Sequence, residues 1–209
     1  MEKESRICGI ILASGFSRRM GEQKLLLPFN NKSILENSIS NIKKSKLSWQ
    51  DIYVVVPNYD KERINIVTNH HLGTVMNKEA ELGMGYSLAK GIRAVQHKAD
   101  AVMVMLADQP EIKPDDINLV YDEFLKRFHS EGKTPPMIIQ TNYQDQHKGH
   151  PILFSSHFFN ELSKLDRDFG GRRILKNYHQ YVSIVASANS YPSDIDTPTD
   201  YNRLLARHR

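Results

Sequence analysis

Residues Ile7 to Ala13 read Ile-Cys-Gly-Ile-Ile-Leu-Ala and run directly into Ser14 to Lys24, which read Ser-Gly-Phe-Ser-Arg-Arg-Met-Gly-Glu-Gln-Lys. The first stretch is apolar almost without alternation, which is typical of a strand buried on both faces of a parallel sheet. Ala101 to Ala107 has the same character. Together these stretches predict the central strands of an α/β sheet.

Further short apolar runs, rich in β-branched residues, follow along the chain. They are Ile52 to Pro57, Gly73 to Asn77, Met137 to Thr141, Pro151 to Phe154 and Val182 to Ala186. Helical patterns separate most of these runs. Strands and helices that alternate in this way predict an α/β layered fold with a mostly parallel sheet.

The helix starts are marked by capping residues. Ser33-Ile34-Leu35-Glu36 has the form of a capping box, and Thr197 precedes a first-turn proline, Pro198. Pro114 also stands where a first-turn proline belongs. Amphipathic helices are predicted over Tyr86 to His97 and Ile117 to Phe128.

Bulk composition indicates an ordinary soluble globular chain. It has 209 residues, 40% hydrophobic and 25% charged, so we expect one domain over residues 1–209. Its apolar runs are too short to span a bilayer, and we expect no membrane segment and no secretory signal. Cys8 is the only cysteine, which excludes an internal disulfide and favours a reducing cytoplasm.

The distribution of positive charge argues against nucleic-acid binding. The net charge is +4, but the basic residues are scattered, and the one modest cluster is Arg203, Arg207 and Arg209. Aromatic and basic residues do not interleave as on a single-strand binding face. A small polyanionic ligand accounts for the charge equally well.

The loop after the first strand is a candidate phosphate site, because ligands of such sheets bind beyond the carboxyl ends of strands. Gly15 and Gly21 allow backbone N–H groups to approach a phosphate, and Arg18, Arg19 and Lys24 add cations. A Walker P-loop is excluded, because five residues separate the glycines and an acid follows. The dinucleotide fingerprint is absent as well.

Carboxylates follow a second buried stretch and precede the last helix. Asp108 comes directly after the strand Ala101 to Ala107, where it is well placed to hold Mg²⁺ against phosphates. Asp194 and Asp196 stand just before Thr197. A zinc site is disfavoured, because the loop with His147 and His150 has no acid at ligand spacing.

Beyond these features, the first loop resembles the Leu-Ala-Ala-Gly-x-Ser-x-Arg-Met-Gly-x-x-Lys signature of the molybdenum-cofactor nucleotidyltransferases. In detail the chain is similar to the molybdenum cofactor cytidylyltransferase branch, from Gly9 to the final helix. The later blocks that match, in order, are Asn77 with Gly83-Met84-Gly85-Tyr86-Ser87-Leu88 and Gly91, Asp108-Gln109-Pro110, Gly149-His150-Pro151, Asp168-Phe169-Gly170-Gly171-Arg172 and Asp196-Thr197-Pro198.

The resemblance implies a three-layer α/β/α Rossmann-like domain with a mostly parallel mixed sheet, here of about seven strands. It implies a Mg²⁺-dependent transferase that moves CMP from CTP onto molybdopterin and releases pyrophosphate. The implied further partner is a molybdenum hydroxylase apoenzyme. The nucleotide-binding residues that it implies are Leu12, Ala13, Ser14, Gly15, Arg19, Lys24, Asn77, Gly83, Ser87 and Asp108.

The same resemblance assigns the catalytic roles. Arg19 and Lys24 would grip the triphosphate, and Asp108 would bind Mg²⁺. Asp196 is the expected second metal ligand, with Asp194 in reserve. The residues implied to face the acceptor are His150, Asp168 and Arg172.

One departure from the signature bears on the nucleotide. Ser14 occupies its second alanine position, where guanylyl-transferring relatives carry glycine, and a small side chain there favours CTP. Two alternatives stay open. One is a nucleotidyltransferase of the same fold that acts on a sugar or polyol phosphate, and the other is a non-enzymatic carrier of a finished cofactor. The combination of Arg19, Lys24, Asp108 and Asp196 argues against the carrier.

Overall fold

The computed structural model describes residues 5–17, 19–131, 134–166 and 170–208. Nine strands lie in this part of the chain: β1 (Ile7–Leu12), β2 (Pro28–Phe29), β3 (Lys32–Ser33), β4 (Ile52–Pro57), β5 (Gly73–Asn77), β6 (Ala101–Leu106), β7 (Ile138–Asn142), β8 (Lys148–Ser155) and β9 (Val182–Ala186). Seven of them form one sheet in the order β5-β4-β1-β6-β8-β7-β9, and β2 and β3 pair separately.

The sheet is mixed because β8 runs against its neighbours. β1 pairs in parallel with β4 and β6, β4 with β5, and β7 with β9, whereas β8 is antiparallel to β6 and β7. The carboxyl ends of β1, β4 and β6 therefore meet at one edge, as the sequence predicts for the centre of the sheet. The loops that follow β1, β4 and β6 therefore lie close together beyond this edge of the sheet.

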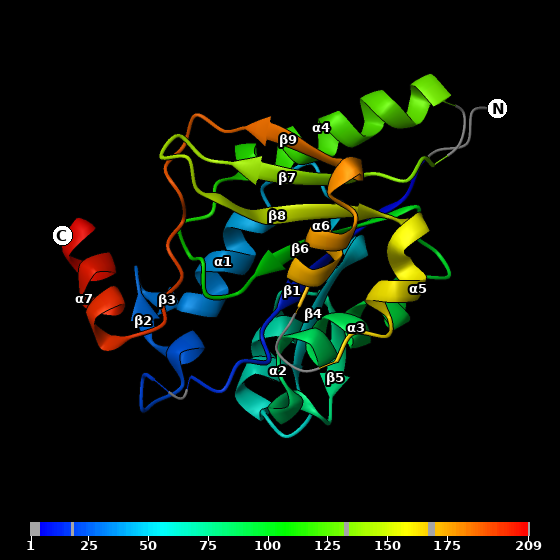
Figure 1. Cartoon of the computed structure of the whole chain (residues 1–209). Helices are drawn as coiled ribbons and strands as arrows, with labels where there is room; N and C mark the ends of the chain where they lie inside the picture. Colours follow the sequence, from blue (N-terminus) through cyan, green and yellow to red (C-terminus); the bar gives the residue numbers. More distant parts are fainter. Residues whose placement is uncertain (1–4, 18, 132–133, 167–169, 209) are drawn as a thin grey trace.

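Seven α-helices are found in the described residues: α1 (Ile34–Ile42), α2 (Lys61–Asn69), α3 (Met84–Val95), α4 (Pro114–Glu131), α5 (Phe159–Leu162), α6 (Arg172–Asn177) and α7 (Pro198–Arg207). The buried side chains form one cluster on each face of the sheet. α1, α2, α4 and α7 contribute to the cluster that contains Ile11, and α3, α5 and α6 to the cluster that contains Ile10. The predicted three α/β/α layers are confirmed (Figure 1).

The helix starts marked by Ser33, Thr197 and Pro114 agree with the structure, whereas the helix predicted over Tyr86 to His97 is α3, two residues earlier. The Ser33 hydroxyl accepts from the backbone N–H of Glu36, and the Glu36 carboxylate accepts from the Ser33 backbone N–H. Thr197 and Asp200 form the same reciprocal pair ahead of α7, with Pro198 in its first turn. Each pair satisfies backbone donors that the helix itself leaves unpaired.

The β2–β3 hairpin was not anticipated by the sequence patterns. Its turn residues, Asn30 and Asn31, have φ values of 46° and 62°, the left-handed conformation that tight hairpin turns require and asparagine tolerates. Each strand has only two residues, too few for a period-two pattern. β8 also begins at Lys148, earlier than the expected Pro151. Within the described residues, every helix is too short or too polar to cross a membrane.

Candidate active site

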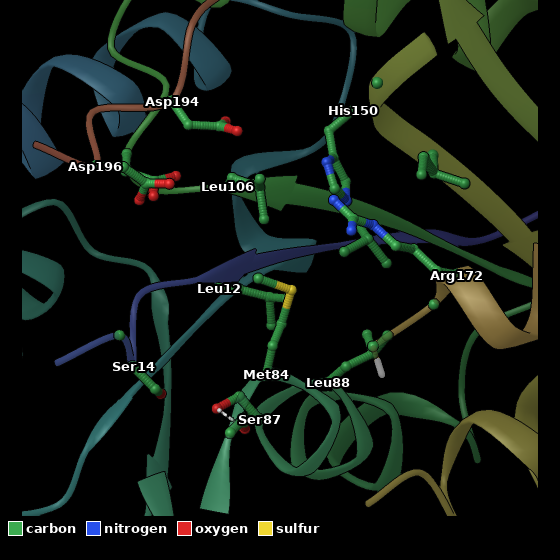
Figure 2. A pocket seen from close by; sticks show the side chains of 18 of the residues that line it. Leu12, Ser14, Met84, Ser87, Leu88, Leu106, His150, Arg172, Asp194 and Asp196 are labelled. Atoms are coloured by element: carbon green, nitrogen blue, oxygen red, sulfur yellow. Dashed lines mark hydrogen bonds between the residues drawn. The ribbon is translucent and has the colours of Figure 1, made fainter. Parts of the chain in front are cut away.

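A pocket of about 630 Å³ opens at the edge where β1 and β6 end. Figure 2 shows carboxylates on one side of it, His150 and Arg172 on another, and Ser14 and Ser87 on a third. The pocket lining includes most of the residues that the sequence singles out: Leu12, Ser14, Gly15, Arg19, Lys24, Gly83, Ser87, Asp108, His150, Arg172, Asp194 and Asp196.

Four predicted residues are absent from the lining that the structure describes. Ala13 and Asn77 are buried behind it, with 1% and 0% of their surfaces exposed. Asp168 and Arg18 lie outside the described residues, so the place of Asp168 beside the acceptor and the role of Arg18 as a loop cation stay predictions. Because Ala13 and Asn77 are buried and do not line the pocket, the structure gives no indication that their side chains contact a nucleotide.

The loop after β1 is hydrogen-bonded to the sheet at Ser14 and turns sharply at Ser17 and Gly21. The Ser14 hydroxyl donates to the carbonyl of Val55 at 3.0 Å, which directs this side chain back toward β4. Gly15 faces open space, since an added Cβ would meet nothing within 4 Å. Ser17 and Gly21 have φ values of 53° and 74°, and the backbone N–H of Lys24 donates to the Ser17 hydroxyl. These turns return the chain to the pocket at Lys24.

Lys24 joins two carboxylates that are far apart in sequence. Its Nζ donates to Asp108 Oδ2 at 2.6 Å and to Asp196 Oδ1 at 2.9 Å. Arg19 Nη2 donates to the other oxygen of Asp196 at 2.8 Å. The carboxylate after β6, the carboxylate before α7 and two cations of the first loop thus form one charge cluster.

Burial and pairing set the charge states in this cluster. Burial lowers the pKa of Lys24, but Asp108 and Asp196 outweigh it, so the net pKa lies above its ordinary value. Burial raises the pKa of Asp196, but hydrogen bonds and charge from Lys24 and Arg19 lower it overall. Lys24 is therefore an ammonium and Asp196 a carboxylate near neutral pH.

Asp194 lies deeper and has neutral partners. It accepts from Gln109 Nε2 at 2.8 Å and from the Tyr191 hydroxyl at 3.2 Å. Burial and the nearby charge of Asp108 raise the pKa of Asp194 to about 6. Because Lys24 and Arg19 contact Asp196 and not Asp194, the two carboxylates have different environments although one residue separates them.

The second predicted nucleotide loop lies across the pocket from the carboxylates. Asn77, at the end of β5, donates from Nδ2 to the Ser87 hydroxyl at 3.1 Å, so it supports Ser87 from behind. Gly83 has a φ of 107°, which glycine adopts readily. An added Cβ at Gly91 would meet Ile10 at 2.8 Å, so this glycine lets α3 lie close against β1. That approach brings Ser87 to the pocket.

The predicted acceptor side is formed by β8 and the start of α6. His150 and Arg172 point toward each other in Figure 2. Burial and the charge of Arg172 lower the pKa of His150 to about 4, so the imidazole is neutral at pH 7. Lys148, Gln140 and Tyr191 also line the pocket, and none of these was predicted from the sequence.

With this geometry established, comparison with known proteins decides the family. The sequence model of the MobA-like NTP transferase domain matches residues 9–182. The chain belongs to this family. It is therefore a nucleotidyltransferase of the MobA-like type, with the α/β fold that its relatives share.

Three relatives show how far the similarity of this MobA-like domain extends. The purine catabolism protein PucB of Bacillus subtilis is 30% identical, and the alignment covers 95% of each chain. The molybdenum cofactor cytidylyltransferase of Escherichia coli is 24% identical over 98% of this chain and 97% of its own. The crystal structure of Rv0371c from Mycobacterium tuberculosis in complex with manganese is 25% identical, with a TM-score of 0.74, covering 97% of this chain and 99% of that one.

The related Rv0371c structure is a complex with manganese. Among the described residues, no group of three or more His, Cys, Asp or Glu side chains is arranged to hold a metal alone. A magnesium ion bound by one or two carboxylates and completed by substrate phosphates needs no such group. The carboxylates of Asp108 and Asp196, which both contact Lys24 Nζ, fit that requirement.

The helix that follows Asp196 in the MobA-like domain is anchored at its far end. Arg207 Nη2 lies 2.5 Å from Glu111 Oε2, and His208 Nε2 lies 2.8 Å from Glu111 Oε1. Burial raises the pKa of Glu111, but hydrogen bonds and charge from His208 and Arg207 outweigh it and lower the pKa overall. Glu111 thus connects the segment after Asp108 to α7.

This anchor predicts a pH dependence of stability. The pKa of Glu111 is lower in the folded protein than in the unfolded chain. Its contribution to the free energy of unfolding is therefore present above the ordinary pKa of about 4.3. This contribution is lost as the pH falls through the folded-state pKa. We expect the melting temperature of the wild type to fall more than that of Glu111→Gln between roughly pH 6 and pH 3. Thermal unfolding of both proteins across this range measures the difference, and parallel curves would contradict it.

Proposed function

We propose that the chain transfers CMP from CTP to the phosphate of molybdenum cofactor (molybdopterin), with Mg²⁺, and releases pyrophosphate. The observation that carries this proposal is the contact of Lys24 with both Asp108 and Asp196 in the pocket of a MobA-like domain. The similarity over nearly the whole chain to a protein named molybdenum cofactor cytidylyltransferase supports the choice of substrates.

In the proposed reaction, an oxygen of the acceptor phosphate attacks the α-phosphorus of CTP. The new P–O bond forms as the bond from the α-phosphorus to the β-bridging oxygen breaks, and pyrophosphate leaves with its electrons. No general base is needed, because the acceptor phosphate is already ionised. The work of the protein is to align two anions and neutralise their charge.

Lys24 and Arg19 are the residues we assign to charge neutralisation. An opposite charge at ~4 Å is worth about 4 kcal/mol at an effective dielectric near 20. Lys24 is the stronger candidate, because its side chain is only 9% exposed while that of Arg19 is 70% exposed. Burial limits screening by water and fixes the position of the ammonium group.

Asp108 and Asp196 are the residues that would hold Mg²⁺. The bound ion would supply Lewis-acid stabilisation of charge on the phosphates. Asp196 is preferred over Asp194 as the second ligand, because Asp194 is more buried and already engaged by Gln109 and Tyr191. We assign to Asp194 the holding of Tyr191 against Gly149, where an added Cβ would meet the Tyr191 ring at 2.5 Å.

The acceptor side supports an anionic ligand with a ring system. Arg172 and Lys148 offer cations there, and apolar side chains such as Ile152 and Phe154 line the same pocket. The neutral His150 offers hydrogen bonding without a second positive charge. We extend the proposal to a cytoplasmic reaction whose product passes to a molybdenum hydroxylase apoenzyme.

The proposal is tested by pyrophosphate release with each of four NTPs, with and without molybdenum cofactor. Release only with CTP and the cofactor is the expected result. Release with a sugar or polyol phosphate but not with the cofactor would move the acceptor to that class. If no combination of NTP and acceptor releases pyrophosphate, the proposed transfer to these acceptors is wrong.

The nucleotide preference gives a sharper prediction at Ser14. We expect Ser14→Gly to weaken the preference for CTP over GTP without reversing it, because removing one side chain shifts discrimination by about 1–3 kcal/mol. The variant also loses the hydrogen bond to Val55 and frees the loop. The measurement is kcat/KM for both nucleotides with one acceptor.

Ser14→Ala is the matched control for this variant. It removes the same hydroxyl but keeps a Cβ, as in the alanine of the family signature, so the CTP preference should stay within a few-fold of wild type. A wild type that prefers GTP or ATP would contradict the base-pocket argument, although nucleotidyl transfer itself would stand.

A further inference from the structure

A buried arginine lies behind the first loop. Arg63 lies in the first turn of α2, and its side chain is only 4% exposed. It is not among the described residues that line the pocket. An arginine in the first turn of a helix is usually solvated, so burial at this position calls for partners.

The Arg63 guanidinium donates to two backbone carbonyls of the loop and, from Nη2, to the side-chain oxygen of Gln23 at 3.5 Å. Nη1 donates to the carbonyl oxygen of Ala13 at 2.7 Å and to that of Gly15 at 3.2 Å. Asp60 balances the charge, with Oδ2 2.9 Å from Arg63 Nε, and its other oxygen caps α2 by accepting from the Arg63 backbone N–H at 3.0 Å. One guanidinium thus links a capped helix to two loop peptides on either side of Ser14.

These contacts fix the orientation of the loop peptides. In a trans peptide the C=O and the following N–H point in opposite directions. Holding the Ala13 carbonyl toward Arg63 turns the Ser14 N–H the other way, and the contact with the Gly15 carbonyl fixes the next part of the loop. Ser14, Gly15 and Phe16 line the pocket. A backbone N–H that faces away from Arg63 on this pocket-lining segment suits an anionic nucleotide.

We propose that Arg63 is a positioning residue for nucleotide binding, which sets the peptide planes of residues 13–16 from behind the loop. The inference rests on the proposed function, in which this loop contacts the nucleotide. Arginine is required because its planar fork places several donors at once, while lysine offers a single ammonium on a flexible stem. Arg63 acts through the backbone and does not touch the substrate.

The test compares Arg63→Met and Arg63→Lys with the wild type by calorimetric titration of CTP with Mg²⁺, which needs no acceptor. We expect the Kd for CTP to rise about tenfold or more in Arg63→Met, because two charge-assisted hydrogen bonds that shape the loop are lost. Arg63→Lys should give a similar loss although it keeps the charge. Amide hydrogen exchange at residues 13–17 should become faster, while β4 and α3 stay protected.

Arg93→Met is the matched control, because Arg93 also donates to a backbone carbonyl, that of Ser163, at 2.9 Å and away from the pocket. It should lower the melting temperature without changing the Kd for CTP. A double variant, Asp60→Asn with Arg63→Met, avoids an unpaired buried carboxylate if the single variant folds poorly.

The outcomes separate the inference from the proposed function. A melting temperature that falls while the Kd and loop exchange stay at wild-type values would make Arg63 structural only and overturn the inference. A Kd for CTP in Arg63→Lys equal to that of the wild type would contradict the requirement for a planar guanidinium at this position. A wild type that binds none of four NTPs would instead overturn the proposed function, and the assignment of Arg63 with it.

Discussion

Asp108→Asn is expected to lower turnover by roughly 10³-fold or more, because a carboxylate that holds a metal against phosphates supplies several kcal/mol of charge stabilisation. Asn keeps the shape of the side chain but not its charge. It also removes the negative charge that lies 2.6 Å from Lys24 Nζ, so the ammonium is held less firmly. Both effects act in the pocket and leave the buried strand before Asp108 intact.

The measurement for Asp108→Asn is the rate of pyrophosphate release at several Mg²⁺ concentrations, with circular dichroism and thermal unfolding as the folding control. Asp122→Asn is the matched control, because Asp122 forms an exposed ion pair with Lys46 far from the pocket. It should turn over like the wild type. An Asp108→Asn protein with full activity would remove Asp108 from the metal site.

The choice between Asp194 and Asp196 is decided by the same assay. Asp196→Asn should raise the Mg²⁺ concentration needed for half-maximal rate, since Asp196 shares Lys24 with Asp108. Asp194→Asn should leave that concentration near the wild-type value, because the contacts of Asp194 are to Gln109 and Tyr191. The reverse pattern would make Asp194 the metal ligand in place of Asp196.

The layered fold follows from local patterns that are strong in this sequence. The buried runs Ile7–Leu12 and Ala101–Leu106 pair with each other at the centre of the sheet, as continuous apolarity predicts for strands covered on both faces. Capping boxes at Ser33 and Thr197 start their helices because the hydrogen bonds involved are local. The two-residue strands of the β2–β3 hairpin and the four-residue helix α5 are too short to carry such patterns.

The candidate site could be predicted where its residues follow strand ends or precede a helix. Lys24, Asp108 and Asp196 meet because strand order places their loops at one edge of the sheet. Arg63 could not be identified in this way, because a charged residue in a helix first turn looks the same in sequence whether solvated or buried. Its burial depends on where α2 packs, a property of the tertiary structure alone.

Lys24→Ala is expected to lower turnover by roughly 10²-fold or more, the scale seen when one preorganised charge-stabilising group is removed. In the structure, the ammonium of Lys24 is within 3 Å of both Asp108 and Asp196, so the variant loses the group that holds the two carboxylates together. Rate constants should be measured with saturating CTP and Mg²⁺, so that lost binding is separated from lost turnover.

The loss of Lys24 also leaves two partly buried carboxylates without their main cation, and removing one partner of a buried ion pair costs stability. The melting temperature of Lys24→Ala should therefore be measured, and the rate compared only where the protein is folded. Lys46→Ala is the matched control, since Lys46 pairs with Asp122 at the surface, where both side chains are 53% exposed. It should keep wild-type rates because an exposed pair contributes little. A Lys24→Ala rate within threefold of the wild type would show that the ammonium only balances the charge of the two carboxylates, and charge neutralisation in the reaction would then have to come from Arg19 and the metal.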